Sequence, residues 1–335
     1  MIHQLLRKLV AVLAPVAALC LVTAPEHGFA QAQNDAKFPT KAIRLVVPFA
    51  VGGSNDIIAR YIAAKLGERI GQSVVVENKA GANSIIGSGF VADSAPDGYT
   101  LLIISNAFTT NPAVYSKLPY DPLKGFTPIA LLGTGPNVIA VWPGLGVNSL
   151  AELVALAKSR ADAPLNYASS GLGGVHHFTG EIFKETAGIP MTHVPYKGAG
   201  QGMNDVIAGQ VQVLVNTVAS ALTHIRSGRL KALAVDSPTR ISLLPDVPTI
   251  SETFPDYKGN AVWWGIMGPP NMPGNLVNLL NRQINAVLQD PEVAKWMQAQ
   301  SAQAAITTPA EFKQRLQDEI TKYKALAVSA NIKIN

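Results

Sequence analysis

The sequence predicts an α/β protein built as two lobes, with mainly parallel sheets and helices that flank them. Three observations support this prediction. From residue 38 onward, short apolar segments alternate with segments of helical periodicity, which is typical of such sheets. Two Gly-rich strand-to-helix turns, at residues 49–56 and 169–174, occur in different halves of the chain. The length of 335 residues is that of about two domains.

The clearest strand, turn and helix follow one another near the N-terminal end. Residues 43–48 are an apolar run typical of a buried strand, and apolar residues within 57–70 recur at intervals of three and four, as on one helical face. Gly52 and Gly53 allow a sharp turn and a close approach of a ligand to the backbone. Ser54 is the expected N-cap. Free N–H groups and the helix dipole suit this turn to an anion; an ordinary βα turn is the alternative.

Residues 1–30 have the layout of a secretory signal peptide. Arg7 and Lys8 precede an apolar run over residues 9–22, and small residues follow. The run is short for a membrane-spanning helix, so we expect an exported, soluble protein from which this segment is removed. Cys20, the single cysteine, lies inside the segment. The expected mature chain therefore has no disulfide and no thiolate metal site.

The charge balance argues against a nucleic-acid partner. Removal of Arg7, Lys8 and Glu26 from the 27 basic and 22 acidic residues leaves 25 and 21, a net charge of +4. No cluster of lysines and arginines is interleaved with aromatic residues, as a nucleic-acid surface would need. The small positive excess suits anionic small ligands.

Further candidate ligand residues follow the carboxyl ends of predicted strands, where open α/β sheets place their ligands. Ser105 and Asn106 follow one such strand; capping of the next helix is the alternative. In the second half of the chain, Ser169, Ser170 and Gly171 open the second Gly-rich helix entrance. Two hydroxyls and the free N–H groups of a helix can hold a carboxylate there without a formal positive charge.

The sequence predicts neither an enzyme nor a cofactor. We find no G-x-S-x-G elbow, no H-E-x-x-H, no complete P-loop and no complete G-x-G-x-x-G after a strand. His176 and His177 are adjacent on a predicted helix, so they face different ways and are poor ligands for one metal ion. At most one of them, taken here as His176, reaches a ligand.

Residues 48–60, with the sequence Pro-Phe-Ala-Val-Gly-Gly-Ser-Asn-Asp-Ile-Ile-Ala-Arg, resemble the first ligand loop of the Bug (Bordetella uptake gene), or TctC, family. These are periplasmic solute-binding proteins of tripartite tricarboxylate transporters. Segments 117–126 and 244–249 also resemble the family, and the likeness covers residues 37–335. The resemblance implies a type II-like periplasmic-binding-protein fold with a ligand cleft between its lobes. It also implies that backbone amides, hydroxyls and bound water hold a ligand carboxylate.

The resemblance adds residues from two later segments to the site. Tyr196 offers an aromatic face with a hydroxyl, and Lys197 is either a ligand cation or a solvated surface lysine. Asn216 stands where many family members carry an acid, which disfavours an amino-acid ligand, and Thr217 follows it. The expected ligand site comprises Phe49, Ala50, Val51, Gly52, Gly53, Ser54, Asp56, Ser105, Asn106, Ser169, Ser170, Gly171, His176, Tyr196, Lys197, Asn216 and Thr217.

We expect the chain to cross between lobes near residues 133–136 and again near 260–265. Domain 1 then comprises residues 37–136 and 260–335, and domain 2 comprises residues 137–259. The expected function is periplasmic capture, by a monomer, of an aliphatic di- or tricarboxylate or of an aromatic carboxylate such as a phthalate. Membrane subunits of the transporter would receive the ligand. A periplasmic carboxylate sensor and a hydrolase of a small acid are the alternatives.

Overall fold

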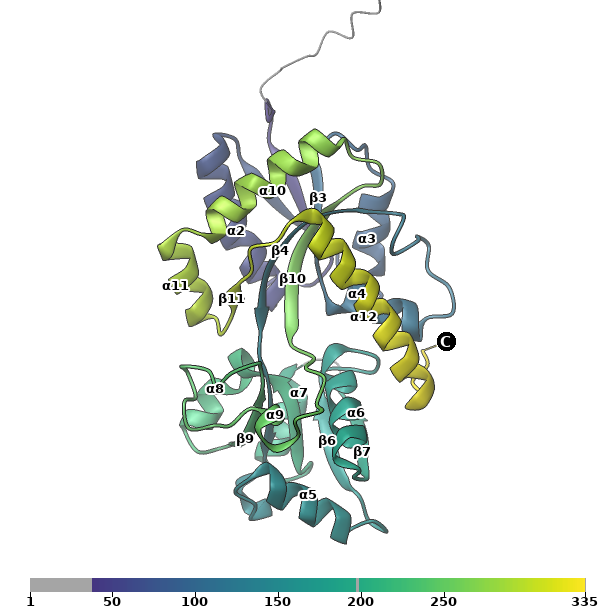
Figure 1. Cartoon of the computed structure of the whole chain (residues 1–335), viewed down its shortest axis with the longest axis vertical. Helices are drawn as coiled ribbons and strands as arrows, with labels where there is room; N and C mark the ends of the chain where they lie inside the picture. Colours follow the sequence, from purple (N-terminus) through teal and green to yellow (C-terminus); the bar gives the residue numbers. More distant parts are fainter. Residues whose placement is uncertain (1–37, 197–198, 335) are drawn as a thin grey trace, which may run out of the picture. The chain divides into compact units, whose positions relative to one another are not determined.

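Two β-sheets organise the chain (Figure 1). The structure, a computed structural model, describes residues 38–196 and 199–334. The described residues from Lys41 onward group as one unit. The first sheet has the strand order β11 (Gln303–Ala304), β4 (Thr127–Gly135), β10 (Val262–Gly268), β3 (Thr100–Ser105), β1 (Ile43–Val47) and β2 (Val74–Asn78). The second has the order β7 (Met191–Pro195), β6 (Leu165–Ser169), β8 (Val213–Thr217), β5 (Asn137–Val141) and β9 (Lys231–Asp236).

Helices connect and flank the strands, which confirms the predicted α/β class. They are α2 (Ser54–Ile70), α3 (Ile85–Ala92), α4 (Asn106–Val114), α5 (Leu150–Ser159), α6 (Val175–Ala187), α7 (Ala199–Ile207), α8 (Val218–Arg226), α9 (Ile250–Thr253), α10 (Gly274–Leu288), α11 (Pro291–Ala299) and α12 (Pro309–Ser329), with one 3₁₀ turn, η1 (Pro143–Leu145). Of these described helices, none combines the length and the apolar character needed to cross a membrane.

The prediction of mainly parallel sheets is wrong, because both sheets are mixed. Strand β1 is parallel to β2 and β3, and β6 is parallel to β7 and β8. Strands β4, β10 and β5 are antiparallel to their neighbours. The difference arises where the chain passes between the sheets. Strands joined by a βα crossover become parallel, whereas β5 follows β4 directly from the other sheet, and so meets its neighbours in the opposite direction.

The first βα unit shows why these residues form these elements. Ile43, Leu45, Val46 and Val47 of β1 are fully buried, as the apolar run predicts. On α2, the side chains at 58, 62 and 66 are also buried, one helical turn apart. Burial of each such side chain stabilises the fold by about 1.5–3 kcal/mol. The packing of α2 against the sheet therefore fixes the position of the loop between β1 and α2.

The first passage between the sheets is shorter than expected. Residues 133–135, near which the sequence predicts a crossing between lobes, continue β4 and pair with β10, which lies beside it in Figure 1. Pro136 alone separates β4 from β5. A Cβ atom at Gly133 would lie 2.5 Å from the carbonyl oxygen of Gln303. The glycine therefore permits close approach of β11 and does not mark a turn.

Candidate functional site

The first candidate loop, residues 49–53, joins β1 to α2. Gly52 has a φ of +81°, a left-handed conformation that favours glycine. Gly53 is the N-cap of α2 and makes no side-chain cap, so the expectation that Ser54 caps the helix is wrong. Ser54 is instead the first helical residue. The loop is exposed from Ala50 to Ser54, so the N-cap and the first residue of α2 lie at the surface, whereas Asn55 and Asp56, the next two residues, are buried.

Asp56 holds this loop together from inside. Its carboxylate is 2% exposed and accepts hydrogen bonds from the backbone N–H of Gly52, at 2.9 Å, and from Asn78 Nδ2, at 2.9 Å. Arg60 Nε donates to the same carboxylate at 3.0 Å, and Asn78 Nδ2 also donates to the carbonyl of Phe49. The hydrogen bond from Arg60, with those from Gly52 and Asn78, lowers the pKa of Asp56 to about 2. The carboxylate of Asp56 is thus ionised at neutral pH, and its hydrogen bonds hold the loop.

Ser105 is the last residue of β3, which lies next to β1 in the sheet, and Asn106 is the first residue of α4. Ser105 is the N-cap of α4, although its side chain makes no capping hydrogen bond. Asn106 is 2% exposed; its Oδ1 accepts from Trp263 N–H at 3.0 Å and its Nδ2 donates to Ala261 O at 3.3 Å. The side chain of Asn106 is therefore tied to the segment that enters β10.

The second candidate loop, residues 169–174, joins β6 to α6. Ser169 Oγ lies 2.7 Å from His193 Nε2 and also accepts from Gly171 N–H at 3.2 Å. Ser170 Oγ lies 2.6 Å from Nδ1 of His176, at the start of α6. Gly171 has a φ of +151°. Both serine hydroxyls that the sequence singles out are thus held by histidines.

His176 is the most notable polar group at this loop. Its side chain is buried, and burial lowers its pKa to about 4, so the ring is neutral at neutral pH. Within the part of the chain that the structure describes, its Nε2 atom is buried and has no hydrogen-bond partner. A buried ring nitrogen without a partner is costly and calls for an explanation. The adjacent His177 differs, because its Nδ1 accepts from Gly173 N–H at 3.1 Å.

The remaining candidates lie at the ends of β7 and β8. Tyr196 donates its hydroxyl to Asp205 at 2.7 Å, and burial together with that carboxylate raises the pKa of Tyr196 to about 12. Asn216 is 1% exposed, and Thr217 caps α8 by accepting from Ser220 N–H. Lys197 lies outside the described residues.

The structure brings the candidates together in two groups, one for each sheet. Strands β1 and β3 are parallel neighbours, so residues 49–56 and 105–106 emerge at the same edge of the first sheet. Strands β6, β7 and β8 are parallel neighbours too, so residues 169–176, 196 and 216–217 emerge at one edge of the second. This is the arrangement in which α/β sheets bind ligands.

A further loop at the first edge was missed from the sequence. Ala82, Asn83 and Ser84, after β2, all have positive φ values, of 45°, 48° and 77°. Asn83 Nδ2 donates to Asn111 Oδ1 at 2.7 Å, and Asn111 Nδ2 donates back to Asn83 O at 2.8 Å. Strained backbone of this kind is frequent at functional sites. The only signal in the sequence was the Gly-Ala-Asn-Ser string.

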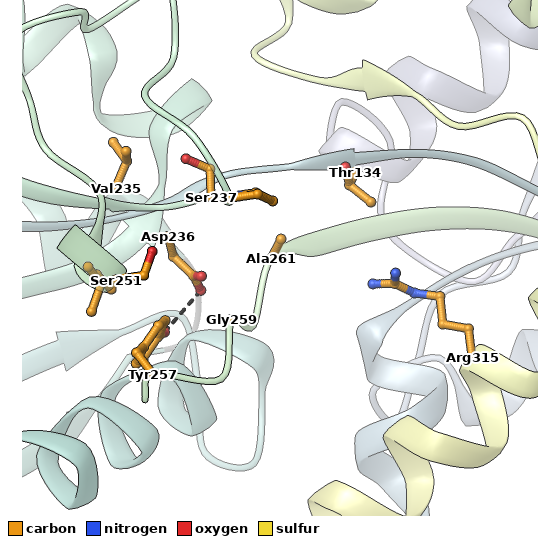
Figure 2. A pocket seen from close by; sticks show the side chains of 11 residues that line it. Thr134, Val235, Asp236, Ser237, Ser251, Tyr257, Gly259, Ala261 and Arg315 are labelled. Carbon is orange, nitrogen blue, oxygen red and sulfur yellow. Dashed lines mark hydrogen bonds between the residues drawn. The ribbon is translucent and has the colours of Figure 1, made fainter. Parts of the chain in front are cut away.

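A hollow of about 400 Å³ lies elsewhere, beside the passages between the sheets (Figure 2). Thr134, Asp236, Gly259, Ala261 and Arg315 are among its lining residues, and none of the predicted ligand residues lines it. In Figure 2 the Arg315 side chain reaches toward it from the α12 side, opposite Asp236 and Tyr257. Within the described residues, no group of three His, Cys, Asp or Glu side chains could hold a metal ion.

Comparison with known proteins is consistent across sequence and structure. The family model "Tripartite tricarboxylate transporter family receptor" matches residues 58–332. Protein BugT of Bordetella pertussis is 35% identical over 300 residues, which span 89% of this chain and 91% of that protein. An R. palustris protein solved with adipate is 33% identical, with a TM-score of 0.79 over 89% of this chain and all of that one. MatC from Rhodopseudomonas palustris, solved with bound malate, is 30% identical, with a TM-score of 0.73 over 86% and 99%.

These matches cover most of the chain and agree with the two-sheet architecture. The predicted likeness to the Bug family is confirmed, and the fold is that of its periplasmic binding proteins. The family consists of binding proteins and not of enzymes. This chain therefore belongs to the tripartite tricarboxylate transporter receptors, the TctC or Bug family of periplasmic solute-binding proteins.

Proposed function

We propose that this protein captures a small organic carboxylate in the periplasm and delivers it to the membrane subunits of a tripartite tricarboxylate transporter. The observation that carries the proposal is the edge loop 49–53, where Asp56 fixes the backbone of Gly52, and where the N-cap Gly53 and the first helical residue Ser54 are exposed. Amides at a helix N-terminus bind anions because they are unpaired and lie at the positive end of the helix dipole. Relatives solved with adipate and malate support a carboxylate as that anion.

The donors at the two edges favour a carboxylate held by hydrogen bonds from neutral groups. The described members of the predicted site include no lysine or arginine, and His176 is kept neutral by burial. Hydroxyl groups and backbone N–H groups donate more strongly to an ionised acceptor than to a neutral one. An aliphatic dicarboxylate or an aromatic carboxylate such as a phthalate would present such an acceptor to one edge or to both.

The proposal includes two lobes, residues 37–136 with 260–335 and residues 137–259, that close on the ligand. The membership of the strands supports this division, since β5 to β9 form one sheet and the remaining strands the other. Closure would favour the state in which both edges contact the ligand. The protein would act as a monomer, after removal of a signal peptide near residue 30.

A ligand panel on residues 31–335 tests the proposal. Adipate, malate, phthalate, benzoate and nicotinate are added in thermal unfolding, followed by calorimetry for every compound that shifts the transition. Binding stabilises by about 2.7 kcal/mol at a hundredfold excess over Kd. We expect at least one acid to raise the midpoint, and its uncharged amide to have no effect. If no acid binds, or if acid and amide bind equally, the carboxylate proposal is wrong.

Export is tested separately. The full chain is expressed in a Gram-negative host, and the N-terminus of the periplasmic product is sequenced. We expect it to begin near residue 31. A product that stays in the cytoplasm with its first residues intact would contradict the periplasmic location.

A further inference from the structure

Asn260 lies just before β10, where the chain returns from the second sheet to the first. It is hydrogen-bonded to β5 and to β9, the first and last strands of the second sheet along the chain. The residue is 2% exposed and immediately precedes the segment that becomes β10. Its backbone N–H donates to the carboxylate of Asp236, at the end of β9, at 3.0 Å. Its carbonyl accepts from Nδ2 of Asn137, the first residue of β5, at 2.8 Å. The backbone of Asn260 is thus hydrogen-bonded both to the start of β5, where the chain enters the second sheet, and to the end of β9, its last strand there.

The side-chain amide of Asn260 joins two helices. Its Nδ2 donates to Val175 O at 3.2 Å and to Thr179 Oγ1 at 2.9 Å, both on α6. Its Oδ1 accepts from Lys322 Nζ at 2.9 Å and from Tyr323 OH at 2.7 Å, both on α12. An amide has two donor hydrogens and two acceptor lone pairs, and all four are used here. A side chain with only donors or only acceptors could not hold both helices.

The contact on α6 falls at the second candidate loop. Val175 is the first residue of α6, and the next residue is His176, which bonds to Ser170. Helix α12 packs against α4, whose first residue, Asn106, belongs to the other edge. Asn260 therefore lies on a path of direct contacts between helices that carry candidates of the two edges.

We propose that Asn260 is a positioning residue for ligand capture, which holds the first turn of α6, and with it the loop 169–174, in register with α12. The expected effect of Asn260 on ligand affinity rests on the proposed function, whereas its expected effect on the position of α6 does not. A polar cluster that only stabilises the fold would have the same hydrogen bonds. A positioning role differs from a purely stabilising one in a testable way. Only in the positioning role does a substitution on α12 change the loop 169–174 and the affinity of the protein for its ligand.

The first test needs no ligand. Tyr323→Phe removes the hydroxyl that donates to Asn260 and accepts from Asn106 Nδ2 at 3.4 Å, and it keeps the ring that packs on Phe178, with centroids 4.8 Å apart. Hydrogen exchange is compared in the parent and the variant, with Tyr61→Phe as the matched control, since Tyr61 stacks on Trp296 of α11. We expect exchange in residues 175–179 to rise about two- to tenfold in Tyr323→Phe alone. Unchanged exchange in α6 would overturn the proposal.

The second test is a double-mutant cycle in the Kd for an acid that the panel identifies, with adipate as the first probe. Thr179→Val removes one of the two α6 acceptors of Asn260, and Tyr323→Phe removes one of its two α12 donors, without opening a gap at Asn260. Each should weaken binding about two- to tenfold, and the double variant should be weaker by less than the product of the two. Fully multiplicative effects, or a lower unfolding temperature with unchanged Kd, would leave Asn260 a stabilising residue only. If the parent binds no acid, the proposed function fails, while the exchange experiment still decides the role of Asn260 at α6.

Discussion

The backbone N–H of Gly52 and the carboxylate of Asp56 form a 2.9 Å hydrogen bond that closes the first candidate loop on the helix that follows it. The donor residue has a left-handed backbone that a side chain would strain, and the acceptor is 2% exposed. The loop is therefore set before any ligand arrives. A site whose amides are held in place loses less entropy on binding than one that must be ordered.

We expect Asp56→Asn to lower both stability and affinity for the ligand. The amide cannot accept from Gly52, Asn78 and Arg60 as the carboxylate does, and hydrogen bonds to a charged group contribute about 1.5–3 kcal/mol each. Urea unfolding and calorimetry measure the two effects. Glu77→Gln is the matched control, since Glu77 also pairs with cations but is 37% exposed. Equal effects of the two variants on affinity would contradict the role given to Asp56.

Gly53→Val should weaken carboxylate binding and leave the fold intact. The φ of Gly53 is −75°, and a Cβ there would meet only Ala50 O, at 3.5 Å. The side chain would, however, stand where the ligand has to approach the amides. Loss of one such hydrogen bond weakens binding about ten- to a hundredfold by calorimetry. Gly274→Val, at the start of α10 with nothing within 4 Å, is the control that should bind normally. Unchanged affinity in Gly53→Val would exclude this loop from the site.

Ser170→Ala should reduce affinity by a similar factor, because it removes a hydroxyl donor and leaves His176 Nδ1 without its 2.6 Å partner. X-ray scattering adds a second measure. We expect the parent to compact at saturating ligand and the variant to compact less at the same ligand concentration. Ser159→Ala, at the exposed end of α5, is the control. A parent that does not compact would disprove closure of two lobes, even with binding confirmed.

We expect stability to fall as the pH is lowered from about 6.5 to 4. Burial lowers the pKa of His176 and His177 to about 4 and that of His193 to about 3, from an unfolded value of 6.5. The unfolded chain binds more protons in this window, so each histidine costs about 1.4 kcal/mol per pH unit. Burial raises the pKa of Asp236 from 3.8 to about 6, which acts in the opposite direction and offsets one of the three.

Urea unfolding at a series of pH values measures this slope. His176→Gln should flatten it by about one proton, and Asp236→Asn should steepen it between pH 6 and 4. If both variants changed the slope of stability against pH in the same direction, groups other than these two would control the acid response.

The sequence was informative where the signal was local. The strand, double glycine and helix of 43–70 lie within one stretch, so apolar spacing was enough to place the loop 49–53. The role of Asp56 was not predictable in this way, because Asn78 reaches it from another strand. The strained Asn83 depends on Asn111, 28 residues later, and the contact of Ser169 with His193 spans 24 residues. The place of Gly133 in β4 was not predictable either, because β11, which approaches it closely, comes from the far end of the chain.

The passage at Pro136 leaves the chain few degrees of freedom. The ring of proline fixes its own φ, the carbonyl of Pro136 accepts from Val218 N–H at 3.0 Å, and Asn137 is bound to Asn260. At this passage, any rotation of one sheet against the other would have to be absorbed by the few torsion angles between Gly135 and Asn137. If the two sheets move against each other as proposed, a passage of one residue would restrict the direction of that movement. Two residues inserted there would remove the restriction without changing either candidate loop.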